Sequence, residues 1–231
     1  MLRKILLFSL TSLGLLAYET TNIQYLYSDR FKGDVFIYDT KDGKKSTITF
    51  EHFRTFSLGD FYMFVDAMEG EKFDGVKYDL YTEISPRLSL SKLSNTQLSL
   101  GILSDFYIAA QINMGSDYKA YLLGVGTDVK LSGFAFVSLN LYHKHTNLHE
   151  DTYQLSLAYS TKDFYNLHWE GFIDITGRDV NTQNQFLFKF YEQQESAESA
   201  YIGCEWLYYD YNFQGTTAHT DVLQAMVKYK F

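Results

Sequence analysis

The chain has 231 residues, a formal net charge of −8 and a mean hydropathy of −0.21. This acidity disfavours binding to nucleic acid through its phosphates, and beyond the N-terminus no apolar stretch reaches the roughly 18 residues that indicate a membrane-spanning helix. Aromatic residues make up 18% of the chain, an abundance typical of membrane β-barrels with aromatic girdles. A single cysteine, Cys204, excludes an internal disulfide and a thiolate metal cluster.

The first segment has the layout of a secretory signal. Arg3 and Lys4 precede an apolar run over residues 5–16, which Ala17 follows. This run is too short for a membrane-spanning helix, which needs roughly 20 residues. We therefore expect residues 1–17 to be a signal peptide and residues 18–231 to form one barrel. A buried N-terminal helix is the alternative for the first segment.

Alternation of apolar and polar residues continues through the rest of the chain and predicts extended strands, because successive side chains of a strand point to opposite faces. Most of the alternating runs are close to the length that a tilted strand needs to cross a membrane. Twelve strands are expected, at residues 21–28, 47–56, 60–68, 78–90, 97–107, 118–131, 134–144, 152–161, 165–175, 185–194, 200–211 and 222–231.

The connections between these strands alternate between long and short. Outer-membrane barrels show this pattern, with short periplasmic turns and longer external loops. Turn-forming residues occupy the short connections at residues 57–59, 132–133 and 162–164. An even number of strands also returns the C-terminus to the periplasmic side, where the chain begins. The sequence therefore predicts an all-β fold, a transmembrane antiparallel up-and-down β-barrel in the bacterial outer membrane.

The face of each strand follows from the cost of charge in lipid, which is about 2–4 kcal/mol for Arg or Lys at the membrane midplane. In strands 60–68, 78–90, 165–175 and 185–194 the face that carries the charged side chains, together with its aromatic residues, is accordingly assigned to the interior, and the opposite, apolar face to lipid. Strand 47–56 does not sort cleanly, so its facing stays open. The inward residues proposed to line the lumen are Tyr62, Phe64, Asp66, Glu83, Arg87, Glu170, Phe172, Asp174, Lys189 and Tyr191.

Pro86, the only proline, lies inside the strand at 78–90. Proline donates no ladder hydrogen bond and is normally kept out of central strands. The sequence therefore predicts a bulge or interrupted pairing beside Glu83 and Arg87.

The last strand ends on Phe231 and has one apolar and one polar face. Leu223, Val227 and Tyr229 share the apolar face, which we expect to contact outer-membrane lipid. Gln224, Lys228 and Lys230 share the other face, which is expected to line or brace a polar passage. A terminal strand of this kind resembles the closing strand that outer-membrane barrels present to the barrel-assembly machinery.

Three stretches resemble one known family. Residues 83–101, EISPRLSLSKLSNTQLSLG, are similar to the central signature of the Tsx-like nucleoside-specific channel-forming outer-membrane proteins. The similarity continues through DFY at 105–107 and YLLGVGTD at 121–128, and GDFYMFVD at 59–66 resembles the family's third strand. The resemblance implies a monomeric twelve-stranded barrel without a cofactor, through which nucleosides or similar small polar solutes diffuse. Residues 134–220 are shorter than the corresponding half of the best-known members.

A passage for nucleosides needs aromatic faces for the base and hydrogen-bond acceptors for the sugar hydroxyls. Tyr62, Phe64, Phe172 and Tyr191 are the candidates for the first role, and Asp66, Glu83, Glu170 and Asp174 for the second. Arg87 and Lys189 are expected to pair with these acids and to narrow the lumen. A net-acidic lining would repel phosphorylated solutes. The alternative is that these charges brace the wall without touching a solute.

Other functions also fit parts of the sequence. His143, His145 and His149, near Glu150 and Asp151, admit a zinc or copper site, although polar loop histidines explain them as well. Ser156 and His168 lie on neighbouring strands, but no nucleophile motif accompanies them, so no enzyme is expected. A structural or receptor-like barrel with a plugged lumen would instead act through external loops, such as residues 29–46 with Lys32, Lys41, Lys44, Lys45, Asp34, Asp39 and Asp42.

Overall fold

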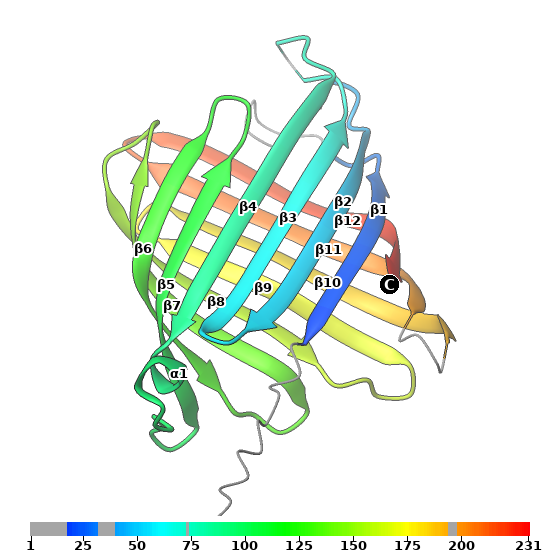
Figure 1. The fold of residues 1–231 in the computed structure, drawn as a ribbon. Coiled ribbons are helices and arrows are strands. Elements are labelled where there is room, and N and C mark those ends of the chain that lie inside the picture. The colour runs from blue at the N-terminus through cyan, green and yellow to red at the C-terminus, as the bar shows by residue number, and fades with distance from the viewer. Residues whose placement is uncertain (1–17, 32–39, 73, 194–197) are drawn as a thin grey trace, which may run out of the picture.

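The computed structural model describes residues 18–31, 40–72, 74–193 and 198–231, and these form a closed antiparallel β-barrel (Figure 1). The expected fold class is therefore confirmed, whereas the expected signal peptide lies outside the described residues. In the described ranges the strands are β1 (Glu19–Ser28), β2 (Lys45–Phe56), β3 (Gly59–Glu69), β4 (Tyr78–Ser89), β5 (Leu103–Met114), β6 (Lys119–Val129), β7 (Phe134–Thr146), β8 (Thr152–Thr161), β9 (Leu167–Thr176), β10 (Asp179–Glu192), β11 (Ser199–Phe213) and β12 (Thr216–Lys230).

Each strand pairs with the next one along the chain, and β1 pairs with β12 to close the barrel. The start of β1 and the end of β12 lie side by side at one rim of the barrel, where the Phe231 N–H donates to the Thr21 carbonyl over 3.0 Å. We call this rim the terminal end; it also carries the connections that follow β2, β4, β6, β8 and β10. The opposite rim, called the loop end, carries the connections that follow β1, β3, β5, β7, β9 and β11.

The expected fifth strand at 97–107 begins too early, because a short helix and a connection follow β4 and β5 runs over Leu103–Met114. In α1 (Leu90–Ser94) the Ser89 side chain caps the first turn by accepting a hydrogen bond from the Lys92 N–H. Asn95 ends the helix in the left-handed conformation, at φ 50°. The chain returns to the wall only at Leu103, so β5 lies six residues later than expected at its start.

The expected alternation of long and short connections is also wrong. The terminal end carries the long connection 90–102, which includes α1 at the lower end of Figure 1. The loop end carries the very short turns 177–178 and 214–215, because β10, β11 and β12 extend beyond their expected limits. Gln214 and Gly215 both have positive φ, 52° and 82°, as the tightest hairpin turns require.

The outer wall is apolar and the interior is polar. Large apolar side chains are exposed all around the outside, among them Ile23, Ile48, Leu80, Leu123, Leu141, Trp169, Phe186, Ile202 and Leu223. Buried polar side chains point inward, among them Asn22, Gln24, Gln111, Asn113, Gln154, Glu205 and Gln224. An exposed apolar wall of this extent is characteristic of a barrel that faces lipid. Within the described ranges no helix is both long and apolar enough to span a membrane.

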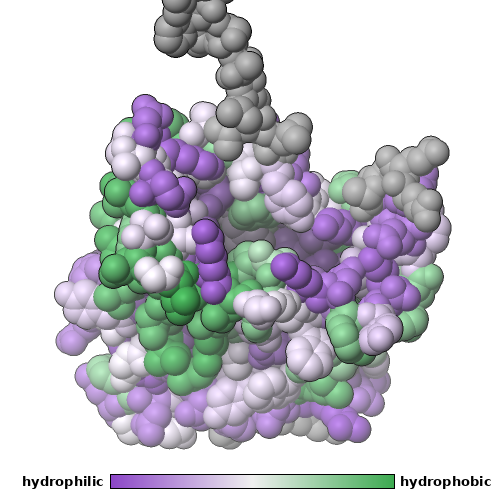
Figure 2. All heavy atoms as spheres, turned by 90° about the horizontal axis from the view of Figure 1, so that it is seen from below, coloured by the Kyte–Doolittle hydropathy of each residue, from purple (hydrophilic) through white to green (hydrophobic). Residues whose placement is uncertain are grey.

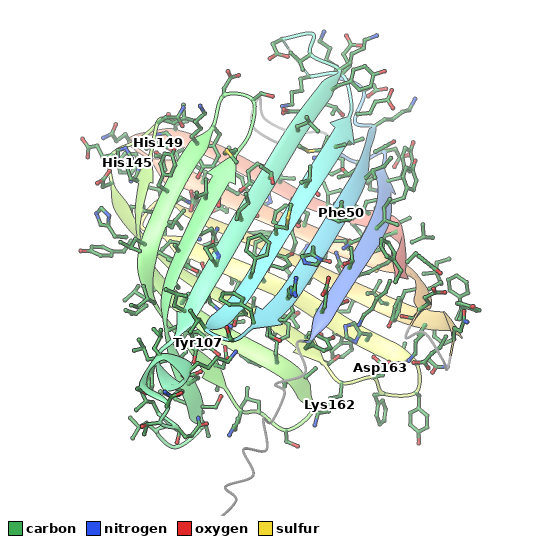
Figure 3. The ribbon with its side chains drawn as sticks, viewed as in Figure 1. Phe50, Tyr107, His145, His149, Lys162 and Asp163 are labelled. Atoms are coloured by element: carbon green, nitrogen blue, oxygen red, sulfur yellow. The ribbon has the colours of Figure 1, made fainter. Side chains whose placement is uncertain are left out.

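Cross-strand pairing confirms the expected facing of strands β3, β4 and β9 and settles that of β2. Phe50 lies opposite Ile23 and is exposed to lipid, as Figure 3 shows for its side chain. Glu51 therefore points inward, opposite the inward Asn22 and Phe64.

Tyr191 was expected in the lumen, and that expectation is wrong. β10 has a bulge between Lys189 and Tyr191, where its register against β11 shifts. Lys189 still lies opposite the inward Tyr201, but Tyr191 lies opposite Ala200, which pairs with the lipid-facing Tyr229. The extra residue thus turns Tyr191 to the outside.

Pro86 interrupts pairing without causing a bulge. β3 and β4 pair continuously through Phe61 and Pro86. On the other side, the pairing of β4 with β5 stops after Ile84 and resumes at Arg87, opposite Ala109, in the same register. The predicted interruption is therefore confirmed and lies on the β5 side, where the missing N–H removes a ladder bond.

Besides a small cluster of Tyr209, Tyr211 and Ala218 on β11 and β12, buried hydrophobic side chains fill the barrel interior at two places on its circumference. Leu26, Leu187, Tyr201 and Met226 form one core cluster, on β1, β10, β11 and β12. Ala109, Ala120, Leu122 and Tyr142 form the other, on β5, β6 and β7. In this second cluster Tyr142, 2% exposed, lies opposite Gly124, where a Cβ would approach the Leu141 carbonyl oxygen at 1.9 Å.

Candidate solute passage

The open part of the lumen lies between two facing walls. One wall is β2, β3 and β4, which cross the front of Figure 1, and the other is β9, which runs behind them. Most inward side chains of both walls are half-buried, whereas those of the core clusters are buried. Seen from below in Figure 2, the barrel end is hollowed, and hydrophilic side chains gather around the hollow. The half-buried inward residues are Thr49, Glu51, Tyr62, Phe64, Asp66, Tyr81, Glu83, Glu170, Phe172 and Asp174.

Aromatic rings follow one another along the β3–β4 wall. The ring centroids of Tyr62 and Phe64 are 6.1 Å apart, and those of Phe64 and Tyr81 are 5.8 Å apart. Phe172 points inward from the β9 wall. Tyr81 was not among the expected site residues, and its position opposite Asp66 on β3 adds it to the row.

The carboxylates nearest these rings have hydroxyl partners. Asp66 accepts a hydrogen bond from the Thr49 hydroxyl over 2.6 Å, and Glu83 accepts one from the Ser85 hydroxyl over 3.0 Å. In the part of the chain that the structure describes, no cation lies within ion-pair distance of either carboxylate. A carboxylate has about four lone-pair positions, so each of these groups retains unused acceptor capacity toward the lumen.

Glu170, unlike Asp66 and Glu83, has a cation beside it, because it belongs to a bridge across the lumen. Lys228 on β12 contacts the carboxylates of Glu170 on β9 and of Glu51 on β2, the latter at 3.2 Å. Gln185 Oε1 also lies 3.4 Å from the Lys228 ammonium. Glu51 accepts further hydrogen bonds from the Tyr62 hydroxyl over 2.5 Å and from the Asn22 and Gln24 amides. We call Lys228, Glu51 and Glu170 the Lys228 bridge; it joins strands that are not neighbours in the wall.

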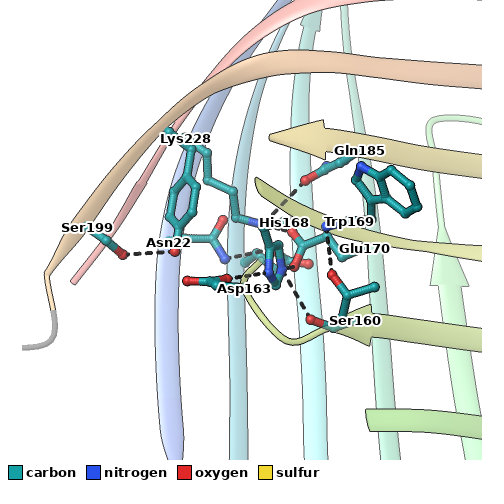
Figure 4. Close-up of polar contacts among 12 residues, drawn as sticks. Asn22, Ser160, Asp163, His168, Trp169, Glu170, Gln185, Ser199 and Lys228 are labelled. Atoms are coloured by element: carbon teal, nitrogen blue, oxygen red, sulfur yellow. Dashed lines mark hydrogen bonds and ion pairs between the residues drawn. The ribbon is translucent and has the colours of Figure 1, made fainter. Parts of the chain in front are cut away.

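His168 continues this network toward the terminal end (Figure 4). Its Nε2 lies 3.1 Å from Glu170 and 3.2 Å from the Ser160 hydroxyl, and its Nδ1 lies 2.9 Å from Asp163. Ser160, rather than Ser156, is thus the serine beside His168. The order Ser160, His168, Asp163 is that of a hydrolytic triad, but Glu170 competes for the nitrogen that would have to accept the serine proton.

Lys189 is held at the terminal rim and does not extend into the passage. Its ammonium lies 2.7 Å from Asp163 and 3.0 Å from Glu192. Partial burial alone would raise the pKa of Asp163, but the hydrogen bond from Lys189 and the charges of Lys189 and His168 outweigh it and hold that pKa below its ordinary value. Lys189 is therefore a bracing residue.

Arg87 likewise forms its contacts with other residues of the barrel wall. Its guanidinium donates two hydrogen bonds of 2.8 Å to Asp60 and one of 3.0 Å to Asp128, and lies 4.1 Å from the centre of the Tyr107 ring. The Tyr107 hydroxyl in turn donates to Asp128 over 2.6 Å. These contacts join β3, β4, β5 and β6 near α1, where Figure 3 places Tyr107. Asp60 and Asp128 were not among the expected site residues.

The histidines considered for a metal site lie at the loop end (Figure 3). His145 Nδ1 is 2.6 Å and His143 Nε2 is 3.6 Å from Asp151, and the hydrogen bond with His145 keeps the pKa of Asp151 below its ordinary value. His149 is elsewhere, stacked on Tyr211 with ring centroids 5.7 Å apart. Across the described ranges, no group of three or more His, Cys, Asp or Glu side chains is arranged to hold a metal ion.

Described parts of the first external loop fold against the barrel mouth. Phe31 is fully buried, and the Lys45 ammonium lies 4.3 Å from the centre of its ring. Lys41 forms an exposed ion pair with Glu71 in the next loop. Lys32, Asp34 and Asp39 lie outside the described residues.

Comparison with known proteins identifies a family and a fold. Residues 38–221 match the family model described as "Nucleoside-specific channel-forming protein, Tsx". The nucleoside-specific channel-forming protein Tsx of Klebsiella aerogenes is 27% identical over 214 residues, which cover 73% of this chain and 72% of that protein. The outer membrane protein OmpK of Vibrio parahaemolyticus is 26% identical over 171 residues, covering 70% of this chain and 59% of OmpK. The chain covers less than half of a second Tsx protein, from Klebsiella pneumoniae.

Among solved structures, the KdgM porin superposes on the barrel with a TM-score of 0.52 at 10% sequence identity, covering 92% of this chain and 99% of the porin. At that identity the likeness shows a common fold.

Proposed function

The chain belongs to the family of nucleoside-specific channel-forming proteins, Tsx, and is an outer-membrane β-barrel; on that premise we propose that it admits nucleosides, or neutral polar solutes of similar size, by facilitated diffusion. The observation that carries this proposal is the composition of the two open walls. Phe64, Tyr81 and Phe172 offer flat apolar faces, and Asp66 and Glu83 offer unused acceptors beside them. A base stacks on aromatic faces and sugar hydroxyls donate to carboxylates.

The proposed site therefore comprises Tyr62, Phe64, Asp66, Tyr81, Glu83, Phe172 and Asp174. Arg87, Glu170 and Lys189 support it by bracing the wall or bridging the lumen, and Tyr191 contacts lipid. Several weak contacts in succession suit a channel, because one tight site would retain the solute. The carboxylates lacking a paired cation favour neutral solutes over phosphorylated ones, since the latter carry negative charge. We propose a monomer, inserted by the barrel-assembly machinery through β12.

Solute flux tests this function directly. Purified protein in liposomes should admit adenosine faster than a sugar of similar size, and adenosine should block the ion current of the barrel. Phe64→Ala and Asp66→Ala should each weaken that block. Matched controls are Phe61→Ala, which removes a lipid-facing phenylalanine of the same strand, and Asp74→Ala in an exposed loop. Unchanged block in Phe64→Ala and Asp66→Ala would remove these residues from the site.

A closed barrel that acts through its external loops is the competing function. Two observations favour it: the Lys228 bridge crosses the lumen, and Phe31 from the first loop is buried at the mouth. The same liposomes distinguish the two functions. Equal and negligible flux of adenosine and of the sugar would reject the channel and support the closed barrel.

A further inference from the structure

Lys228 occupies an unusual position for a bracing residue. Neighbouring strands of a barrel are already joined by their backbone ladders, and the ion pairs of Arg87 link β4 to the adjacent β3 and to β6 one strand further on. The Lys228 bridge instead joins β2 to β9 through β12, and these three strands are not neighbours. Lys228 reaches both carboxylates through a flexible side chain, and these contacts are separate from the backbone ladders, so the bridge can open without disturbing any strand pairing.

The charges of the bridge do not cancel. One ammonium faces two carboxylates, and the Lys228 side chain is only 6% exposed, so its charge is largely shielded from water. Tyr62, the first ring of the aromatic row, donates to Glu51 of the same bridge. The bridge therefore adjoins the terminal-end side of the proposed site. A solute that has passed the aromatic row meets Glu51 and Glu170 next.

Lys230 provides a comparison within the same strand. It shares the inward face of β12 with Lys228, and it pairs with Asn22 across to β1. Its ammonium lies 6.0 Å from the centre of the Tyr18 ring, and in the described part of the chain no carboxylate lies within ion-pair distance of it. Two lysines of equal charge, two residues apart, thus differ in whether they cross the lumen.

We propose that Lys228 sets the width and the charge selectivity of the passage, an inference that rests on the proposed channel function. With the bridge closed, the ammonium satisfies both carboxylates and blocks the lumen between β2 and β9. A solute passes by replacing the ammonium with hydrogen-bond donors of its own. Neutral solutes that carry hydroxyl or amino donors do this, whereas an anion would bring further negative charge beside Glu51 and Glu170.

Single-channel recording in planar bilayers under a KCl gradient tests this role. Lys228→Gln should raise the conductance several-fold and shift the reversal potential toward that of potassium, because the two carboxylates then face an open lumen without a cation. Lys230→Gln removes the same charge and should leave both quantities close to those of the wild type. Circular dichroism checks that each variant keeps its β-barrel.

Glu170→Gln is the second variant and separates width from charge. It also weakens the bridge, so the conductance should rise, but it removes one carboxylate, so the reversal potential should move away from that of potassium. A folded Lys228→Gln protein with wild-type conductance and reversal potential overturns the role of Lys228, and so does an equal effect of Lys230→Gln. If the wild type passes a current that adenosine blocks, either of these results rejects the role of Lys228 and leaves the proposed channel function intact. No current through any variant rejects the channel function and the proposal with it.

Discussion

Replacing Arg87 with methionine should destabilise the barrel without altering the proposed solute site. The substitution leaves Asp60 without its two hydrogen bonds of 2.8 Å, in a place where the Arg87 and Asp60 side chains are only 12% and 9% exposed. Breaking a buried ion pair from one side costs about 3–5 kcal/mol. Asp128 is more exposed and keeps the hydrogen bond from Tyr107, so we expect a loss toward the lower end of that range.

Urea unfolding in lipid vesicles measures this loss, with the fluorescence of the lipid-facing Trp169 and Trp206 as the signal. The matched control is Arg54→Met, which removes an arginine whose 3.7 Å pair with Glu19 is more than half exposed; such pairs contribute about 0–1 kcal/mol. The double variant Asp60→Asn, Arg87→Met should recover part of the stability, because it leaves less unpaired charge. A loss in Arg87→Met no larger than in Arg54→Met, or a double variant less stable than Arg87→Met, would refute the reasoning.

Three further predictions concern the second core cluster, the bulge in β10 and the terminal end of the barrel. Tyr142→Ala empties the second core cluster and should lower the free energy of unfolding by about 3–5 kcal/mol, whereas Tyr153→Ala, at a lipid-facing position 68% exposed, should change it little; similar losses in the two variants would contradict the packing described. In a Trp169→Phe, Trp206→Phe background, Tyr191→Trp should be quenched by brominated lipids and Tyr201→Trp should not, and equal quenching would place Tyr191 in the lumen after all. The pKa of Asp163 is held below its ordinary value in the folded protein. Its ion pair therefore stabilises the folded state fully at pH values above the unfolded pKa of about 3.9. That contribution is lost as the pH falls through the lower pKa of the folded state. Asp163→Asn should therefore lower stability at pH 7 but much less at about pH 3, and a difference of the same size at both pH values would contradict the ion pair with Lys189.

The sequence predicts the wall better than the connections, for a physical reason. A strand in a barrel has lipid on one side and polar interior on the other, so its two-residue period is strong, and the facing of β3, β4 and β9 follows from it. A bulge adds one residue and reverses every later assignment, which is why Tyr191 was misplaced. Residues 179–184 at the start of β10 are polar on both faces apart from Val180, so the period fades there, and the sequence predicts a loop where the strand continues.

The site itself was predictable only in part. Facing alone identified Phe64, Asp66, Glu83 and Phe172 as inward. It could not separate bracing residues from solute-contacting ones, because that depends on which charges meet across the lumen. Glu51 was missed as the partner of Lys228 since the facing of β2 was open. Asp60 and Asp128 both occupy inward positions, which the alternation of the sequence indicates. Their pairing with Arg87 depends on distances between strands, which the sequence does not contain.

The stretch of the sequence that resembles the family most closely lies largely outside the proposed site. Residues 83–101 form the end of β4, α1 and the connection that follows. Ser89 donates to Asp105, and the Lys92 ammonium donates to the carbonyls of Phe56 and Gly59 in the neighbouring turn. The signature thus builds mainly the terminal end of the barrel, and of the proposed site it contains only Glu83. A family match through residues 83–101 is therefore informative mainly about architecture, whereas the similarity at residues 59–66 includes Tyr62, Phe64 and Asp66 of the proposed site.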